Sequence, residues 1–208
     1  MFEYFLSLLL GYFIGSLPTA YLLVKWKTCL DVREAGSGNV GAMNTFNVTG
    51  SKFLGALVMV IDLLKGVSAV WLTSLLLGKE FWIIAVGGLG SMAGHSYPVW
   101  LKFKGGRGLS TAAGVMMILG WIFVAIWCSL WTIMYVSFRN IHLSNIAASI
   151  STPIVIILTP ENLISKVLPH YTEANNFLYL SVLICLFILV RHLEPISEML
   201  KSLNKTYS

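Results

Sequence analysis

Long apolar segments dominate this sequence and leave few folds open to it. The apolar runs cover residues 2–24, 53–77, 81–100, 111–138, 145–159 and 177–192. A helix that crosses the hydrocarbon core of a bilayer needs about 20 apolar residues, and several of these runs reach that length. Only 11% of the residues are charged, whereas soluble domains carry about 25%. We therefore predict an all-α integral membrane protein.

The number of spans depends on how the run 111–138 is interpreted. A single helix of that length would measure about 42 Å at about 1.5 Å per residue, against a hydrocarbon core of about 30 Å. Gly120 lies inside the run, and a break there would give helices 111–119 and 121–138. The chain then has seven helices in place of six.

Positive charge favours seven helices, because Lys and Arg concentrate in cytoplasmic loops. With seven helices and the N-terminus outside, only Lys79 and Lys166 fall on the outer side, whereas six helices spread the later cations over both sides. We predict seven transmembrane helices, an outer N-terminus and a cytoplasmic C-terminus. With no internal repeat, residues 1–208 are expected to form a single domain. The net charge of +5 suits anionic headgroups, and its scatter over short loops indicates no nucleic-acid partner.

Residues 31–44, the first glycine segment, combine three glycines with serine and amide side chains. The candidate ligands in this segment are Ser37, Gly38, Asn39 and Asn44. Glycines let a backbone approach a ligand closely, and concave clusters of N–H groups bind anions. The alternative is an ordinary flexible loop. We favour an anion site formed by this predicted cytoplasmic segment.

Residues 94–111, the second glycine segment, place two cations among glycines just before an apolar run. The candidates are Lys104, Gly105, Gly106, Arg107 and Gly108. Ser110 or Thr111 then resembles a helix N-cap, and a helix N-terminus with free N–H groups and cations binds phosphate. The alternative is a positive loop that only fixes the topology.

Three further positions are candidates. His95 lies beside the second glycine segment, and His192 ends the last apolar run, where Arg191 is also typical of a simple membrane anchor. Asp62 and Lys65 are three residues apart within a predicted membrane helix, so they can pair on one face. Such a pair can be a buried structural ion pair or can contact substrate directly.

Several reaction classes lack their signatures here. The chain has no nucleophile elbow, Walker loop or metal-ligand spacing, and Cys29, Cys128 and Cys185 lie too far apart in sequence to suggest a disulfide framework. Two anion-binding segments at a membrane surface instead favour direct transfer between two phosphorylated substrates. Proximity and electrostatic stabilisation would then supply the catalysis.

Three segments of the chain resemble the motifs of a known family. GSGNVGAMN, GHSYPVWLKFKGGRG and RHLEP, in that order and at matching spacing, are similar to the three motifs of the bacterial acyl-phosphate:glycerol-3-phosphate acyltransferases. The first two are long and specific, and the resemblance covers almost the whole chain. It implies seven helices, with the motifs on the cytoplasmic side of the bacterial cell membrane.

The resemblance also implies an activity and a site. Enzymes of this family move a fatty acyl group from acyl phosphate to the 1-hydroxyl of glycerol-3-phosphate, giving lysophosphatidate, and need no metal or cofactor. The expected partners are these two substrates, membrane lipids and the soluble enzyme that forms acyl phosphate. Carried onto this chain, the catalytic residues are His95, Lys104 and His192. The substrate-binding residues are Ser37, Gly38, Asn39, Asn44, Gly105, Gly106, Arg107 and Gly108.

Four positions depart from the family pattern. Met43 replaces a threonine, Asn47 an arginine, Pro195 an asparagine and Glu198 a common basic residue. The loss of a cation and an amide falls on the expected acceptor site, whereas the donor site keeps its pattern. Two alternatives therefore stay open: a paralogue that acylates another acceptor, and a non-catalytic membrane transporter or lipid-binding protein.

Overall fold

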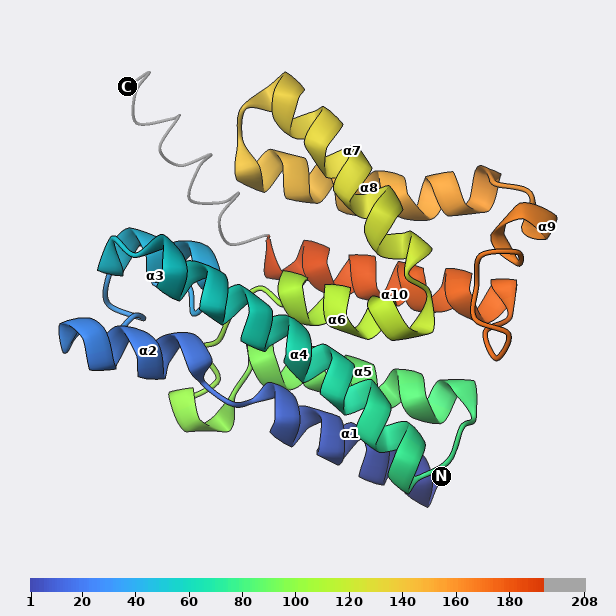
Figure 1. The fold of residues 1–208 in the computed structure, drawn as a ribbon, viewed down its shortest axis with the longest axis horizontal. Helices are drawn as coiled ribbons and strands as arrows, with labels where there is room; N and C mark the ends of the chain where they lie inside the picture. Colours follow the sequence, from blue (N-terminus) through green and yellow to red (C-terminus); the bar gives the residue numbers. More distant parts are fainter. Residues whose placement is uncertain (193–208) are drawn as a thin grey trace. The chain divides into compact units, whose positions relative to one another are not determined.

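The computed structural model describes residues 1–192, and every regular element among them is a helix (Figure 1). The helices of the first part are α1 (Phe2–Gly15), α2 (Thr19–Thr28), α3 (Ala42–Thr49), α4 (Lys52–Leu76), α5 (Phe81–Ser96), the 3-10 turn η1 (Val99–Leu101) and α6 (Leu109–Leu119). The helices of the second part are α7 (Ile122–Phe138), α8 (Ile141–Leu158), α9 (Glu161–Ile164) and α10 (Ala174–Arg191). Pro195 and Glu198 lie outside the described residues.

The chain forms two compact units, the first ending at Leu119 and the second beginning at Gly120. The predicted break of the run 111–138 is confirmed, since α6 ends at Leu119 and α7 begins at Ile122. Packing explains the glycine at the break. A Cβ on Gly120 would lie 2.5 Å from the ring of Phe177 and 3.3 Å from Leu168.

The first apolar run differs from the sequence prediction. We expected one helix over residues 2–24, but the run is divided into α1 and α2 by the segment 16–18. Pro18 has no backbone N–H and takes the N-cap position of α2. The prediction was wrong because it relied on hydropathy, which one proline barely changes. Hydropathy does not register the backbone hydrogen bond that Pro18 cannot donate.

Small residues let α1 and α5 approach each other closely. Gly11 of α1 lies against the backbone of Gly87, and Gly94 of α5 lies against the backbone of Tyr12, with no room for a Cβ at either glycine. Membrane helices commonly associate through such small residues, because backbones then meet in van der Waals contact. This packing fixes the C-terminal end of α5, which carries His95.

Four stretches of the described residues are long and apolar enough to cross a membrane. They are Phe2–Thr28, Lys52–Leu76, Ile141–Leu158 and Ala174–Arg191. The helices Leu109–Leu119 and Ile122–Phe138 are also apolar but shorter. These helices agree with an all-helical membrane protein.

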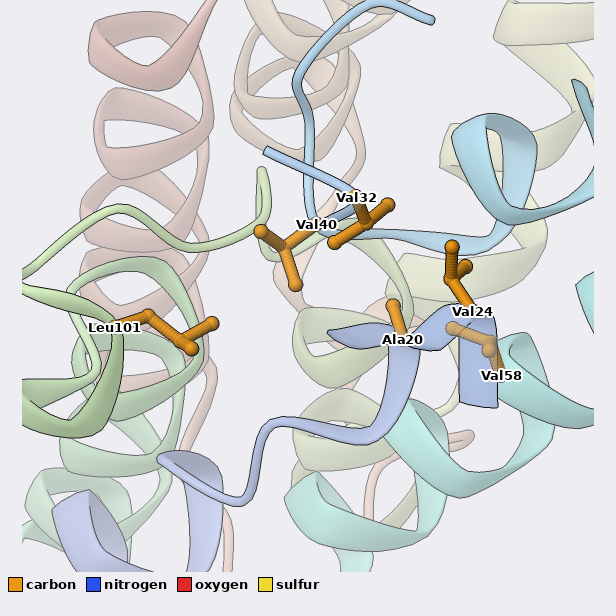
Figure 2. Close-up of a cluster of buried hydrophobic side chains, with 6 residues drawn as sticks. All are labelled: Ala20, Val24, Val32, Val40, Val58 and Leu101. Carbon is orange, nitrogen blue, oxygen red and sulfur yellow. The ribbon is translucent and has the colours of Figure 1, made fainter. Parts of the chain in front are cut away.

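A buried apolar cluster in the first unit anchors the first glycine segment (Figure 2). Its members come from α2, α4, η1 and the segment itself, namely Ala20, Val24, Val32, Val40, Val58 and Leu101. Val32 and Val40 lie near the two ends of the segment. Burying a valine side chain stabilises a fold by about 2 kcal/mol, so the segment is held at both ends.

Candidate active site

Three ionisable side chains meet inside the first unit. Asp62 and Lys65 of α4 and His95 of α5 are only 3%, 4% and 9% exposed. The Lys65 ammonium donates a hydrogen bond of 2.7 Å to Asp62 Oδ1. The same oxygen lies 3.6 Å from His95 Nδ1, which is too long for a hydrogen bond but close enough for a strong charge interaction. The Asp62 carboxylate therefore interacts with both the Lys65 ammonium and the His95 imidazole.

Lys65 also links this cluster to the break between α1 and α2. Its ammonium donates a second hydrogen bond, of 2.6 Å, to the carbonyl oxygen of Leu17. Leu17 precedes Pro18, where the helical ladder is interrupted. The break thus supplies an acceptor, and Lys65 satisfies it while paired with Asp62.

A small pocket is lined in part by the three ionisable groups. Its walls are Leu17, Pro18, Thr19, Ala20, Val40, Asp62, Lys65, His95, Pro98 and Leu101. The pocket therefore combines apolar walls with one carboxylate, one ammonium and one imidazole.

The second glycine segment folds back onto the end of α5. The N–H groups of Gly105 and Gly106 donate to the carbonyl oxygens of Ser96 and His95, both at 3.1 Å. Gly106 also lies against the His95 ring and against the Val40 carbonyl. These two glycines let the second glycine segment pack closely against His95. Their N–H groups already donate to backbone carbonyl oxygens.

The two expected cations of this segment differ in exposure. The Lys104 side chain is exposed, whereas Arg107 is half-buried. Gly108 has a φ of +82° directly before α6, a conformation that favours glycine. The predicted N-cap at Ser110 or Thr111 was wrong, because α6 begins at Leu109. Ser110 and Thr111 are ordinary N-cap residue types, but the chain already turns into the helix at Gly108, so both lie inside α6.

The first glycine segment is organised by one buried amide. Asn44 donates to the carbonyl oxygens of Val32 and Ala35, at 3.1 Å and 3.0 Å, and accepts from the Ser37 N–H at 2.9 Å. Its observed contacts hold the segment in shape, so a contact of Asn44 with substrate stays a prediction. Asn39 and Gly38 are half-buried, and Ser37 is exposed.

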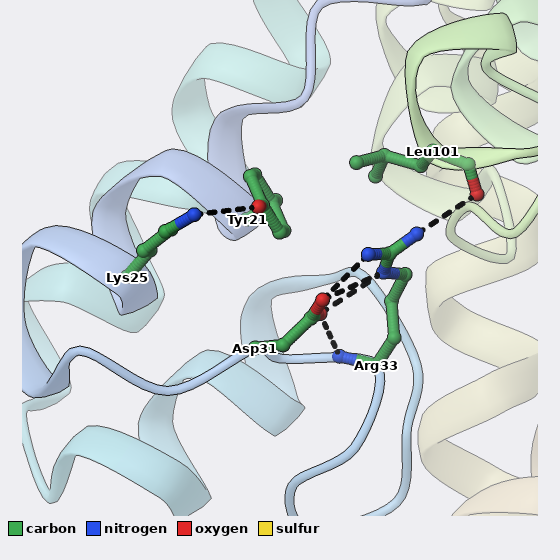
Figure 3. A network of polar contacts seen from close by, with 5 residues as sticks. All are labelled: Tyr21, Lys25, Asp31, Arg33 and Leu101. Atoms are coloured by element: carbon green, nitrogen blue, oxygen red, sulfur yellow. Dashed lines mark hydrogen bonds and ion pairs between the residues drawn. The ribbon is translucent and has the colours of Figure 1, made fainter.

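An arginine joins the two glycine segments (Figure 3). Arg33 donates from Nε to Asp31 Oδ1 at 3.0 Å and from Nη1 to the Leu101 carbonyl at 3.2 Å, and it lies over the Tyr21 ring at 5.4 Å. The side-chain hydrogen bonds from Arg33 hold the pKa of the Asp31 carboxyl below its ordinary value. This network and the contact of Gly106 with Val40 bring the two segments together.

His192 belongs to the second unit, directly after α10. It is fully buried, and its Nε2 lies 3.1 Å from the side-chain nitrogen of Asn145 on α8. Its proposed catalytic role stays a prediction. The departures Met43 and Asn47 are both on α3, and both are exposed.

Asp62 and Lys65 are the candidates that sequence reasoning undervalued. Their spacing showed that they could pair, but nothing in the sequence placed His95 of another helix beside them. The signal was available in one respect, since ionisable residues inside a membrane helix are costly and usually functional.

This arrangement can accept a proton and stabilise the resulting charge. Because the negative Asp62 carboxylate lies 3.6 Å from His95 Nδ1, charge attraction favours a proton on Nδ1, which leaves Nε2 as the atom that can accept a second proton. If Nε2 takes a proton, the imidazolium gains the attraction of the Asp62 carboxylate. Such a pair suits general-base chemistry on a hydroxyl.

Comparison with known proteins gives a consistent result. The model of the glycerol-3-phosphate acyltransferase family matches residues 5–202. The chain is 36% identical over 208 residues to a glycerol-3-phosphate acyltransferase of Anaplasma phagocytophilum, covering 97% of this chain and 98% of the relative. It is 42% identical over 151 residues to the enzyme of the same name from Rhodopseudomonas palustris, covering 73% and 75% of the two chains.

Solved structures agree with the sequence matches. PlsY, an integral membrane glycerol 3-phosphate acyltransferase, has been crystallised in a glycerol 3-phosphate form. That structure is similar to this chain with a TM-score of 0.78 and 30% identity, covering 96% of this chain and 92% of PlsY. Its lysophosphatidic acid form gives a TM-score of 0.76.

Proposed function

The chain belongs to the glycerol-3-phosphate acyltransferase family, and we propose that it acylates the 1-hydroxyl of glycerol-3-phosphate with acyl phosphate as the donor. The product is lysophosphatidate, from which phospholipids are made. The observation that carries this proposal is the buried cluster of Asp62, Lys65 and His95 at the wall of a small pocket. It lies where the two glycine segments meet.

The proposed reaction balances without a covalent enzyme intermediate. The hydroxyl oxygen of glycerol-3-phosphate attacks the acyl carbon, an ester bond forms, and the bond from that carbon to the phosphate oxygen breaks. Inorganic phosphate leaves with the electron pair. The hydroxyl proton passes to His95 Nε2. Because acyl phosphate is a mixed anhydride, the protein needs chiefly to align the hydroxyl and neutralise the developing charge.

The roles of the remaining residues follow from their positions. Lys104, exposed on the second glycine segment, and Arg107 supply positive charge to the phosphates. Ser37, Gly38 and Asn39 contribute the second phosphate site on the first glycine segment. Asp62 stabilises the imidazolium of His95.

We further propose the arrangement in the membrane. Seven spans, with an outer N-terminus and a cytoplasmic C-terminus, would place both glycine segments at the cytoplasmic face, where soluble glycerol-3-phosphate and the enzyme that supplies acyl phosphate are found. The support is the break at Gly120 and the distribution of Lys and Arg. The chain would act as one domain in the bacterial inner membrane.

The test is lysophosphatidate formation by the purified protein in lipid nanodiscs. Acyl phosphate with glycerol-3-phosphate is expected to give product, and acyl-CoA in place of acyl phosphate is expected to give none. Absence of product from a folded sample would refute the proposal. Product with a different phosphorylated acceptor, and none with glycerol-3-phosphate, would instead support the divergent paralogue.

A matched pair of variants links the product to the site. Lys104→Met should lose most of the activity, because it removes the exposed cation that is proposed to bind phosphate. Lys102→Met is the control, since Lys102 is also an exposed cation of the same segment and has no proposed role. Equal loss in both variants would indicate a general effect of surface charge and would contradict the assignment.

A further inference from the structure

Two tryptophans join the helices α7 and α8 in the second unit. Trp127 Nε1 donates to Ser149 Oγ at 3.2 Å, and Trp131 Nε1 donates to Asn145 Oδ1 at 2.6 Å. The step of four residues along α7 is matched by four residues back along α8, so the two helices are antiparallel. An indole N–H can only donate, so the Asn145 atom that faces Trp131 is the oxygen.

This orientation turns the Asn145 amino group toward His192. The side-chain nitrogen of Asn145 lies 3.1 Å from His192 Nε2. Because an amide nitrogen only donates, Nε2 must accept and carries no proton. On the other side of the ring, His192 Nδ1 lies 2.8 Å from the Ile188 carbonyl oxygen, which only accepts. Both partners therefore require the same neutral form, with the proton on Nδ1.

We propose that Asn145 is a positioning residue that keeps His192 neutral, as the Nδ1-protonated tautomer, and that Trp131 holds Asn145 in the required orientation. A second proton on Nε2 would face the Asn145 amino group inside a site where both residues are buried. Two donors that oppose each other in such a site are costly. His192 therefore does not take the proton of the attacking hydroxyl.

Among the described residues, titratable or charged groups in or beside this network lie on three helices. The His142 ring on α8 lies 6.3 Å from the His192 ring, and Tyr135 on α7 stacks on Trp131 at 5.0 Å. Arg191 directly precedes His192 on α10.

The inference rests on the proposed function in one respect: it leaves His95 as the histidine of the predicted site that can accept the proton. His192 then acts as a neutral hydrogen-bonding group. The two histidines differ in the group that each ring faces, which is a carboxylate for His95 and an amide for His192. The state of each ring is set by the group that faces it.

Nitrogen-15 NMR of the ring atoms tests the proposal in the full-length protein. The chain has 4 histidines, and a His192→Gln variant identifies the signals of His192. We expect His192 to show a protonated Nδ1 and an unprotonated Nε2 at neutral pH. In Asn145→Asp the new carboxylate should convert the ring to the doubly protonated form at neutral pH. Trp131→Phe should broaden or shift the same signals.

The control variant is Trp127→Phe, which removes the neighbouring indole bond between the same two helices without touching Asn145. It should leave the His192 signals unchanged. Overturning results would be a protonated Nε2 in the parent protein, an unaltered His192 in Asn145→Asp, or an equal change in Trp127→Phe. The spectra need no substrate, so a correct tautomer in a protein that forms no lysophosphatidate would refute the proposed function alone.

Discussion

Replacing Gly106 by alanine tests whether the second glycine segment positions His95. A Cβ on residue 106 would lie 2.6 Å from the Val40 carbonyl oxygen and 2.8 Å from His95 Cε1, and closer still to Nε2. Gly106 lacks the positive φ that makes alanine strained at other glycines of the chain. The substitution therefore acts through contact with the imidazole and the Val40 backbone.

The expected size of the effect follows from these distances. Ordinary carbon contacts begin at 3.4 Å, so the His95 ring must withdraw from its position, and the Val40 carbonyl must also yield. A displacement of about 1 Å at a reacting group costs about 100-fold in rate. Overpacking of this kind destabilises a fold by about 1–3 kcal/mol. We expect Gly106→Ala to lower kcat by about 100-fold in a protein that remains folded.

The assay is lysophosphatidate formation at saturating acyl phosphate and glycerol-3-phosphate. Thermal unfolding of the same nanodisc sample is measured beside it. Gly50→Ala is the control. Gly50 has a φ of +67°, and a Cβ added there would meet no atom within 4 Å, so alanine costs about 1 kcal/mol of strain without a clash. Gly50→Ala should keep its kcat. Wild-type kcat in Gly106→Ala would refute the role of the segment in placing His95.

Three further predictions concern stability. Lys65→Met should destabilise the protein by about 3–5 kcal/mol, because it leaves the Asp62 carboxylate buried without its partner, and addition of Asp62→Asn should recover much of the unfolding free energy. Asn44→Ala should cost about 3 kcal/mol in denaturant unfolding, since three backbone groups lose their partner. The lowered pKa of Asp31 contributes stability above its ordinary pKa of 3.8 that is lost as the pH falls through the folded-state value. The melting temperatures of Asp31→Asn and the parent should therefore converge below pH 3.8.

Much of the helical architecture could be predicted from hydropathy and charge. The positions of α4, α8 and α10 follow the apolar runs closely. The break at Gly120 was predictable because the run exceeded the bilayer thickness. The break at Pro18 was missed, since apolar residues flank it on both sides and hydropathy does not register a missing N–H group.

The candidate site was predictable in its residue types but not in its hydrogen bonds. Glycine and amide residues in a polar segment indicate anion binding, yet the N–H groups of Gly105 and Gly106 donate to carbonyl oxygens at the end of α5. Asn44 likewise spends its amide on the backbone of its own segment. Such competition between ligand and backbone is decided by tertiary packing, which a sequence pattern does not contain.

The ionisable cluster shows a second limit. The pairing of Asp62 with Lys65 is local to one helix and follows from their spacing. The approach of His95 depends on how α5 packs against its neighbours, and small residues such as Gly94 determine that packing. A general base and the carboxylate that stabilises it therefore lie far apart in sequence and become neighbours only in the fold.

The most direct test of this account is the kcat of His95→Gln with saturating acyl phosphate and glycerol-3-phosphate, measured beside His170→Gln, which alters an exposed histidine of the second unit. General-base catalysis contributes about 100- to 10,000-fold. The account predicts a loss of that size in His95→Gln and none in His170→Gln. A kcat for His95→Gln equal to that of the parent would contradict it and would assign the hydroxyl proton to the departing phosphate.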